Sequence, residues 1–207
     1  MSKIFFKPFV GKNYTNGGIF GKRIMVLGES HYCDEECADC GSCCKHPECM
    51  NFTNDVVTTY LRSRNGEVEG ENWMNTFLKF ERSLVGHETT NEDSKQIWNS
   101  VIFYNYLQVA MDETRQAGTL EQYKQAQETL FDIFCQYRPD YVIAWGKRLF
   151  EKLTEKGWQD RADIVVDDYH IANGVYIPYN IKVMAVYHPS VGYSWDYWYR
   201  AIKEFTK

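Results

Sequence analysis

One short segment of this chain holds a dense group of metal-ligating side chains. It contains six of the seven cysteines and one histidine: Cys33, Cys37, Cys40, Cys43, Cys44, His46 and Cys49. Thiolates separated by two to four residues match tetrahedral Zn²⁺ sites, in which the metal holds together a loop that has no core of its own. Thiolates also suit iron–sulfur clusters. We therefore expect a structural metal here, with zinc as the first choice and an iron–sulfur cluster as the second.

Two other interpretations of these cysteines are open. Disulfides or free thiols are disfavoured, because the thiols are clustered and the N-terminal sequence MSKIFFKPFVGK has no export signal. Cys33, Cys37 and Cys40 also have the spacing of radical enzymes that use S-adenosylmethionine. The two residues before Cys40 include no aromatic residue, however, and the chain shows too few strand–helix units for a barrel. The same N-terminus leads us to expect a cytoplasmic protein.

Three groups of polar residues follow apolar runs that are typical of buried strands. The runs cover residues 23–27, 141–144 and 181–186, and the polar loops read GESHY (28–32), WGK (145–147) and HPS (188–190). In parallel sheets the carboxyl ends of the strands meet at one edge, where ligands bind. Each loop alone is a weak signal, but their shared position after strands indicates a common site.

The elements that position these loops alternate between strand and helix. We expect a further short strand at 164–166, and helices from Thr53 or Asn54 to Leu61 and over 73–85, 120–137, 147–153 and 195–205. Residues 97–109 fit either a strand or a buried helix, whereas 1–22, 62–72 and 86–96 are expected to be irregular. The alternation predicts an α/β fold of three layers, α/β/α, around a central, mostly parallel four-stranded sheet. We expect one domain over residues 1–207, with the cysteine-rich insertion at about 33–50.

Composition and charge narrow the possible partners. Hydrophobic residues make up 44% of the chain and charged residues 25%, which are ordinary values for a globular protein. No apolar run is long enough to cross a membrane, so no membrane partner is expected. The net charge of −5 argues against a broad basic surface that coats nucleic acid, but it permits a local basic groove.

Taken in order, these segments resemble the uracil-DNA glycosylase superfamily. The loop with Gly28, Glu29 and Tyr32 is similar to the superfamily's water-activating motif after the first strand. Phe52-Thr53 resembles the Phe-Ser pair whose ring stacks on the extruded base. The segment IFYNYL (102–107) looks like the one whose Asn, here Asn105, reads the edge of uracil.

The later segments extend the resemblance over nearly the whole chain. Residues 142–147 are similar to the superfamily's apolar strand that ends in Trp-Gly-Lys or Trp-Gly-Ser. His188-Pro189-Ser190 resembles the final motif, whose His contacts a carbonyl of the base. Between the first two motifs lies the cysteine segment, and its position predicts that it shapes or covers the mouth of the site.

The resemblance implies hydrolysis of the N-glycosidic bond of uracil or another damaged base in DNA. Such a reaction needs the base to be extruded, stacked and read by hydrogen bonds, with a donor near the carbonyl that gains charge. Glu29 would then orient water and His188 would be the donor. The substrate-binding residues would be Gly28, Ser30, Tyr32, Phe52, Asn105 and Ser190.

The chain also departs from the superfamily's pattern. Ser30 stands where the best-known branch has its water-orienting Asp, and His31 stands where that branch has Pro. Tyr193 lies where a duplex-wedging residue is expected, and it is either a wedge or a packed aromatic. Ser30 and the acidic net charge support an alternative function, a non-catalytic nucleic-acid or nucleotide-binding module on the same scaffold.

Overall fold

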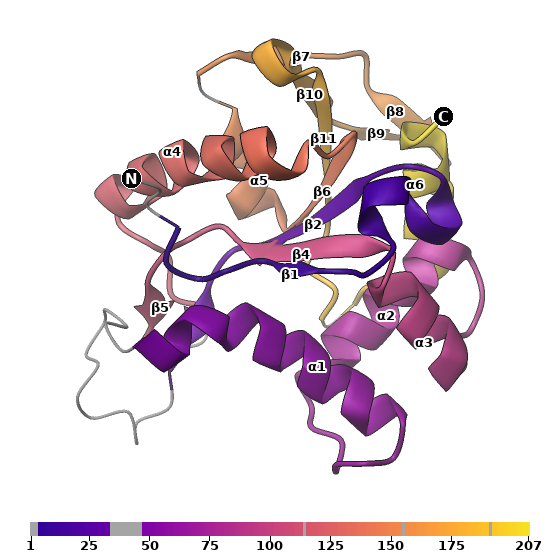
Figure 1. The fold of residues 1–207 in the computed structure, drawn as a ribbon. Helices are drawn as coiled ribbons and strands as arrows, with labels where there is room; N and C mark the ends of the chain where they lie inside the picture. The colour runs from indigo at the N-terminus through magenta and orange to yellow at the C-terminus, as the bar shows by residue number, and fades with distance from the viewer. Residues whose placement is uncertain (1–3, 34–46, 114, 155, 191) are drawn as a thin grey trace.

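The computed structural model describes residues 4–33, 47–113, 115–154, 156–190 and 192–207. A seven-stranded sheet lies at its centre, in the order β1-β4-β2-β6-β11-β10-β7 (Figure 1). Four adjacent strands are mutually parallel: β4 (Val101–Asn105), β2 (Ile24–Gly28), β6 (Tyr141–Trp145) and β11 (Ile181–Val186). The remaining strands, β1 (Phe9–Val10), β10 (Asn173–Tyr176) and β7 (Trp158–Asp160), pair antiparallel at the two edges.

The four parallel strands read as apolar runs because both of their faces are covered. Every residue of β2, β4 and β6 is buried, as expected for parallel strands between layers of helices. One face packs against α1 (Phe52–Arg64), α2 (Met74–Val85), α3 (Asn91–Trp98) and α6 (Trp195–Phe205). The other face packs against α4 (Leu120–Tyr137) and α5 (Lys147–Leu153), and Figure 1 shows α4 lying along the sheet.

The expectation of a four-stranded sheet is wrong in number, although the three strongest predicted strands do form its parallel centre together with β4. The sheet gains three short edge strands of two to four residues, which are too short to show a hydrophobic period. The predicted strand at 164–166 exists as β8 (Ile164–Val166), but it pairs with β9 (Tyr169–Ile171) in a separate hairpin. A second small pair joins β3 (His31–Tyr32) to β5 (Ala110–Met111).

The structure corrects the prediction for residues 86–96 and resolves the ambiguous prediction for residues 97–109. Residues 86–96 were expected to be a loop, but α3 begins at Asn91 behind a capping box formed by Thr90 and Asp93. This polar helix was missed because only its last two residues, Ile97 and Trp98, are large and apolar. The ambiguous segment 97–109 contains β4, and the first predicted helix runs to Arg64, three residues beyond its expected end.

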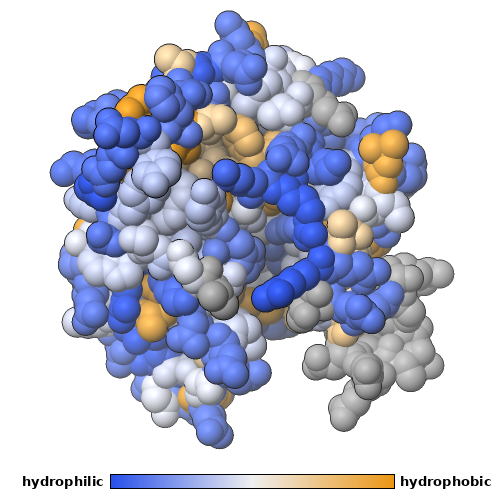
Figure 2. Space-filling view, turned by 180° about the vertical axis from the view of Figure 1, so that it is seen from behind, coloured by the Kyte–Doolittle hydropathy of each residue, from blue (hydrophilic) through white to orange (hydrophobic). Residues whose placement is uncertain are grey.

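The helices predicted over 73–85, 120–137 and 195–205 are confirmed. Short 3₁₀ turns complete the chain at Tyr14–Asn16, Gly18–Phe20, Pro47–Asn51 and Ile177–Tyr179. Within the described part of the chain, every helix is too short or too polar to cross a membrane. Hydrophilic side chains cover most of the face seen in Figure 2, with hydrophobic residues scattered among them, so that face offers no broad apolar surface.

Candidate functional site

A row of four positions crosses the carboxyl edge of the parallel strands. Gly28 lies opposite Asn105, and Trp145 lies opposite Val186. Since Leu27 pairs with Ala144, Gly28 and Trp145 are the next neighbours across β2 and β6. Alternation along each strand directs these positions toward the face covered by α1 and α2, where Phe103, Trp145 and Val186 pack. This face therefore offers one continuous floor at the end of the sheet.

Gly28 is required by the side chain beside it. A Cβ at this position would lie 2.1 Å from Oδ1 of Asn105. The Asn105 carboxamide thus fills the space that a side chain on β2 would take, and Asn105 is only 6% exposed. Any larger residue at position 28 would displace it. Gly28 and Asn105, which were both predicted to bind substrate, therefore pack against each other at the edge of the sheet.

The other end of the Asn105 carboxamide contacts the ring of His31. Its Nδ2 lies 3.0 Å from Nδ1 and 3.2 Å from Nε2 of the imidazole. The His31 ring stacks on Phe52, with 4.5 Å between centroids and 20° between planes, and its Nε2 lies 2.9 Å from the Thr53 hydroxyl. Phe6 approaches edge-on at 4.7 Å. We call Phe6, Phe52, Thr53 and Asn105 the ring cage.

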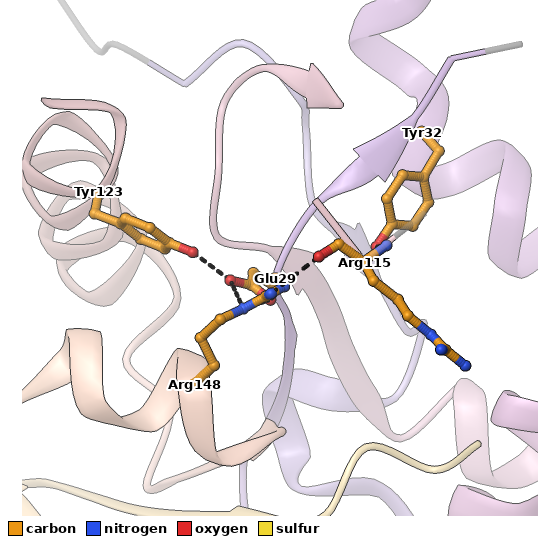
Figure 3. A network of polar contacts seen from close by, with 5 residues as sticks. All are labelled: Glu29, Tyr32, Arg115, Tyr123 and Arg148. Atoms are coloured by element: carbon orange, nitrogen blue, oxygen red, sulfur yellow. Dashed lines mark hydrogen bonds and ion pairs between the residues drawn. The ribbon is translucent and has the colours of Figure 1, made fainter. Parts of the chain in front are cut away.

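Glu29 has a different set of partners, on the α4 and α5 side of the sheet. Its Oε1 accepts hydrogen bonds from the Tyr123 hydroxyl and from Nε of Arg148 at 2.9 Å (Figure 3). Its Oε2 accepts from Nε at 3.0 Å and from Nη2 of Arg148 at 2.5 Å. The Glu29 carboxylate is thus held by two nitrogens of the Arg148 guanidinium group. The Glu29 side chain is 14% exposed.

The same network reaches two residues further along the site. Arg148 donates through Nη1 to the carbonyl of Arg115 at 3.0 Å, and the Arg115 amide donates to the Tyr32 hydroxyl at 3.3 Å. Figure 3 shows the Arg115 guanidinium pointing away from Glu29. Burial, with the hydrogen bond to Glu29, raises the pKa of Tyr123 to about 12, so its hydroxyl stays a donor.

His188 lies close enough to Glu29 and Arg148 for their charges to affect its pKa. Its ring meets Trp145 edge-on at 6.2 Å between centroids. Desolvation lowers the pKa of His188; nearby Glu29 opposes that shift, and Arg148 adds to it. The side chain is nevertheless exposed to solvent. It therefore lies in a recess that solvent reaches but that protein atoms crowd, and its imidazole is neutral at pH 7.

The structure brings most of the predicted site residues together at one edge. Gly28, Glu29, Asn105 and His188 all lie there, and Phe52 approaches from the start of α1. The two turns at 28–32 and 188–190 flank the end of β6, on the same edge of the sheet.

The remaining predicted residues of the site have varied environments. Tyr32 is 39% exposed. The Ser30 hydroxyl is buried and has no hydrogen-bond partner among the described residues. Ser190 is exposed, and its carbonyl accepts from Nζ of Lys79 at 2.6 Å. Tyr193 is buried against Ser83 at 2.9 Å, so it is a packed aromatic and not a wedge.

The predicted metal ligands fall mostly outside what the structure describes. Cys37, Cys40, Cys43, Cys44 and His46 lie outside the described residues. Cys33 and Cys49 both pack against Phe6 and Ala110, beside Phe52. The described ranges contain no cluster of three or more side chains able to ligate a metal. The two ends of the cysteine segment thus meet beside the ring cage, and the metal itself stays a prediction.

Three residues that shape the site were not predicted from the sequence. Arg148 stands two residues after the strand-end glycine at 146, and a charged residue at that position was a usable signal. Tyr123 lies in the first turn of an amphipathic helix, where nothing in the sequence distinguishes it from a core residue. His31 was noted only as a departure from the superfamily's pattern, although it fills the ring cage.

Comparison with known proteins does not assign this chain to a family. No family model matches the sequence, and no curated protein matches it either. The function is therefore inferred from the geometry of the site.

Proposed function

We propose that this protein recognises an extruded pyrimidine base in DNA, and that it hydrolyses the N-glycosidic bond of uracil or another damaged base. The observation that carries the proposal is the ring cage, in which an aromatic face, a carboxamide and a hydroxyl surround one flat heteroaromatic ring. The proposal includes the three-layer α/β/α arrangement of the uracil-DNA glycosylase superfamily. It also includes a structural zinc in the cysteine segment.

The ring cage has the chemistry that a pyrimidine needs. An aromatic face such as Phe52 stacks on any base, and each stacked base contributes about 1–3 kcal/mol. A carboxamide offers both a donor and an acceptor, which together match the polar edge of uracil. Asn105 is held by its fit over Gly28, so its orientation is fixed before a ligand arrives. These features support recognition of a base by shape and by hydrogen bonds.

The charges beside His188 suit a departing anionic base. Cleavage of the glycosidic bond leaves negative charge on the base, and donors aimed at that charge lower the barrier. A neutral His188 can donate one hydrogen bond, and the positive Arg148 and Arg115 lie near enough to lower its pKa. The same positive potential would stabilise the anion. In this proposal His188 is the donor to the base.

Glu29 would orient the attacking water in this mechanism. Among the described residues, the hydrogen bonds to its carboxylate come from Tyr123 and Arg148. These are three donor groups, and a carboxylate has about four acceptor positions, so one position is left for a water.

That same observation favours the second candidate function. A carboxylate held by two nitrogens of a guanidinium group is well suited to fixing the loop 28–32 in place. If Glu29 only fixes the loop, the chain binds a base or nucleotide without cleaving it. The second candidate is therefore a nucleic-acid or nucleotide-binding module that uses the same ring cage.

One assay separates the two functions. The protein is incubated with single- and double-stranded oligonucleotides that carry one uracil, with thymine in the matched control, and then treated with hot alkali. Strand scission at uracil alone is the result expected for the glycosylase. A uracil-dependent mobility shift without scission indicates the binding module. Identical behaviour of the uracil and thymine strands, with neither scission nor shift, would overturn both.

A further inference from the structure

The ring cage is already filled by a side chain of the protein itself. His31 is 4% exposed, and its contacts are an aromatic stack, an edge-on aromatic ring, a hydroxyl and a carboxamide. An imidazole and a pyrimidine are both flat rings with polar nitrogen atoms in the ring. The groups that hold the one are therefore the groups that would hold the other.

The position of the Asn105 carboxamide strengthens this comparison. Its Nδ2 is almost equally distant from the two ring nitrogens of His31. In the plane of the ring, an atom at these distances would collide with the carbon between the nitrogens, so the amide lies over the ring. The carboxamide is thus not committed to a single lone pair of His31. Its Nδ2 can therefore face a different ring in the same place, while its Oδ1 stays packed over Gly28.

The backbone that carries His31 is weakly anchored. It belongs to β3, a strand of two residues that, within the described ranges, pairs with the two residues of β5. Short pairs of this kind open at much lower free energy than the central strands of a sheet. Immediately after β3, Cys33 packs beside Phe52 and begins the cysteine segment. Movement of His31 is therefore available without disturbing the parallel sheet.

We propose that His31 is a built-in occupant of the base subsite, and that a base binds only when the His31 ring leaves the ring cage. This inference rests on the proposed function, because it concerns the same site. It makes His31 a gate that sets the affinity of the site, since a ligand must compete with a tethered ring. A subsite that is filled nine-tenths of the time binds its ligand about tenfold more weakly than an open one.

The test removes the His31 ring by substitution and adds free imidazole or uracil to take its place. His31→Ala leaves a hole the size of an imidazole, and the thermal midpoint of the variant should fall. We expect millimolar imidazole and free uracil each to raise that midpoint again, and neither to shift the midpoint of the unaltered protein. Affinity for a uracil-containing single strand should rise roughly tenfold in the variant. His170→Ala is the matched control, because His170 is exposed and lies on the β8–β9 hairpin.

The outcomes separate this inference from the proposed function. Rescue by imidazole but not by uracil would show an ordinary core histidine and overturn the inference. Rescue by neither ring would overturn it as well.

A second measurement uses the unaltered protein and does not depend on the folding of the variant. The ring resonances of His31 are followed by NMR as a uracil-containing strand is added, and they should move to values typical of an exposed histidine. Uracil binding with unmoved His31 resonances leaves the proposed function standing and removes the gate. Absence of uracil binding by both proteins, with imidazole rescue intact, removes the proposed function.

Discussion

Glu29 and His188 are close in space, yet their environments differ sharply. Glu29 faces a guanidinium fork and a tyrosine hydroxyl, while His188 is a neutral imidazole in a recess. A carboxylate and a neutral donor are the pair that hydrolysis of a glycosidic bond requires, one for water and one for the departing base. The roles of Glu29 and His188 can be tested separately, because each role predicts a different experimental result.

Glu29→Gln tests the role of the carboxylate. The amide keeps the size of the side chain but cannot orient a water as a base, so excision of uracil should fall by about 100-fold or more. Binding of the uracil strand should change by less than about threefold, because Glu29 does not line the ring cage. Single-turnover scission rates and a binding titration measure the two effects. Unchanged scission rates would remove Glu29 from the mechanism.

His188 predicts a specific dependence on pH. Desolvation lowers its pKa in the folded protein, so between that pKa and 6.5 the unfolded chain binds more protons than the folded one. The free energy of unfolding contributed by this residue is therefore complete above pH 6.5 and decreases as the pH falls toward the lowered pKa. NMR titration of the His188 ring, assigned with His188→Gln, gives the value directly. A midpoint at or above 6.5 would contradict the recess described for this side chain.

At the scale of elements, one buried carboxylate joins α2 to α3. Glu81 is fully buried and accepts hydrogen bonds from Thr89 at 2.5 Å, Ser94 at 2.7 Å and Trp98 at 2.9 Å. Two of these donors lie in α3, the helix that the sequence did not reveal. These hydrogen bonds add to the burial of Ile97 and Trp98 at the end of α3, and together they hold a short, mostly polar helix against α2.

Glu81→Gln should weaken this junction. The amide nitrogen replaces an acceptor with a donor, so one buried donor is left without a partner, at a cost of about 1–3 kcal/mol in the free energy of unfolding. Urea unfolding measures the loss. Glu92→Gln is the control, because Glu92 is an exposed residue of α3 and its replacement should change stability by less than about 0.5 kcal/mol. Equal effects of the two substitutions would refute the proposed role of Glu81.

The cysteine segment predicts a metal-dependent element beside the ring cage. Replacing Cys37 and Cys40 together by Ser should release the proposed metal and lower the thermal midpoint by at least about 5 °C, because the sequence of the segment has few apolar residues with which to build a core. Metal content per chain and the colour of the protein distinguish zinc from an iron–sulfur cluster. Cys135→Ser is the control, since Cys135 is exposed on α4. An unchanged midpoint in the double variant would argue against a structural metal.

The elements that the sequence revealed are those with strong periodic signals. The apolar runs of β2, β6 and β11 and the amphipathic patterns of α2, α4 and α6 were all predicted at nearly their observed bounds. Edge strands of two to four residues carry no such pattern, and α3 is a mostly polar helix whose large apolar residues, Ile97 and Trp98, stand only at its end. Contacts between distant elements, such as Glu29 with Tyr123 and Arg148, were beyond any local pattern.

At the scale of the whole molecule, strand order decides where the site lies. The helix after β2 covers one face of the sheet, and the helix after its neighbour β6 covers the other. Adjacent strands whose connections diverge in this way leave a crevice at their carboxyl ends, which is the general binding position of such sheets. The sequence predicted that its three strand-end loops share one edge, and the structure places them there, but the sequence did not indicate that His31 fills the cage.

Asn105 and the rest of the ring cage are proposed to receive the base, and NMR can observe this contact at the Asn105 side chain itself. Labelled protein is titrated with a single strand that carries one 2′-fluoro-deoxyuridine, which resists cleavage, or thymidine as the control. The side-chain amide of Asn105 is assigned through its absence from Asn105→Ser. We predict that this amide resonance shifts with the uracil strand and stays in place with thymidine. A uracil strand that binds while the Asn105 amide stays unmoved would contradict the account.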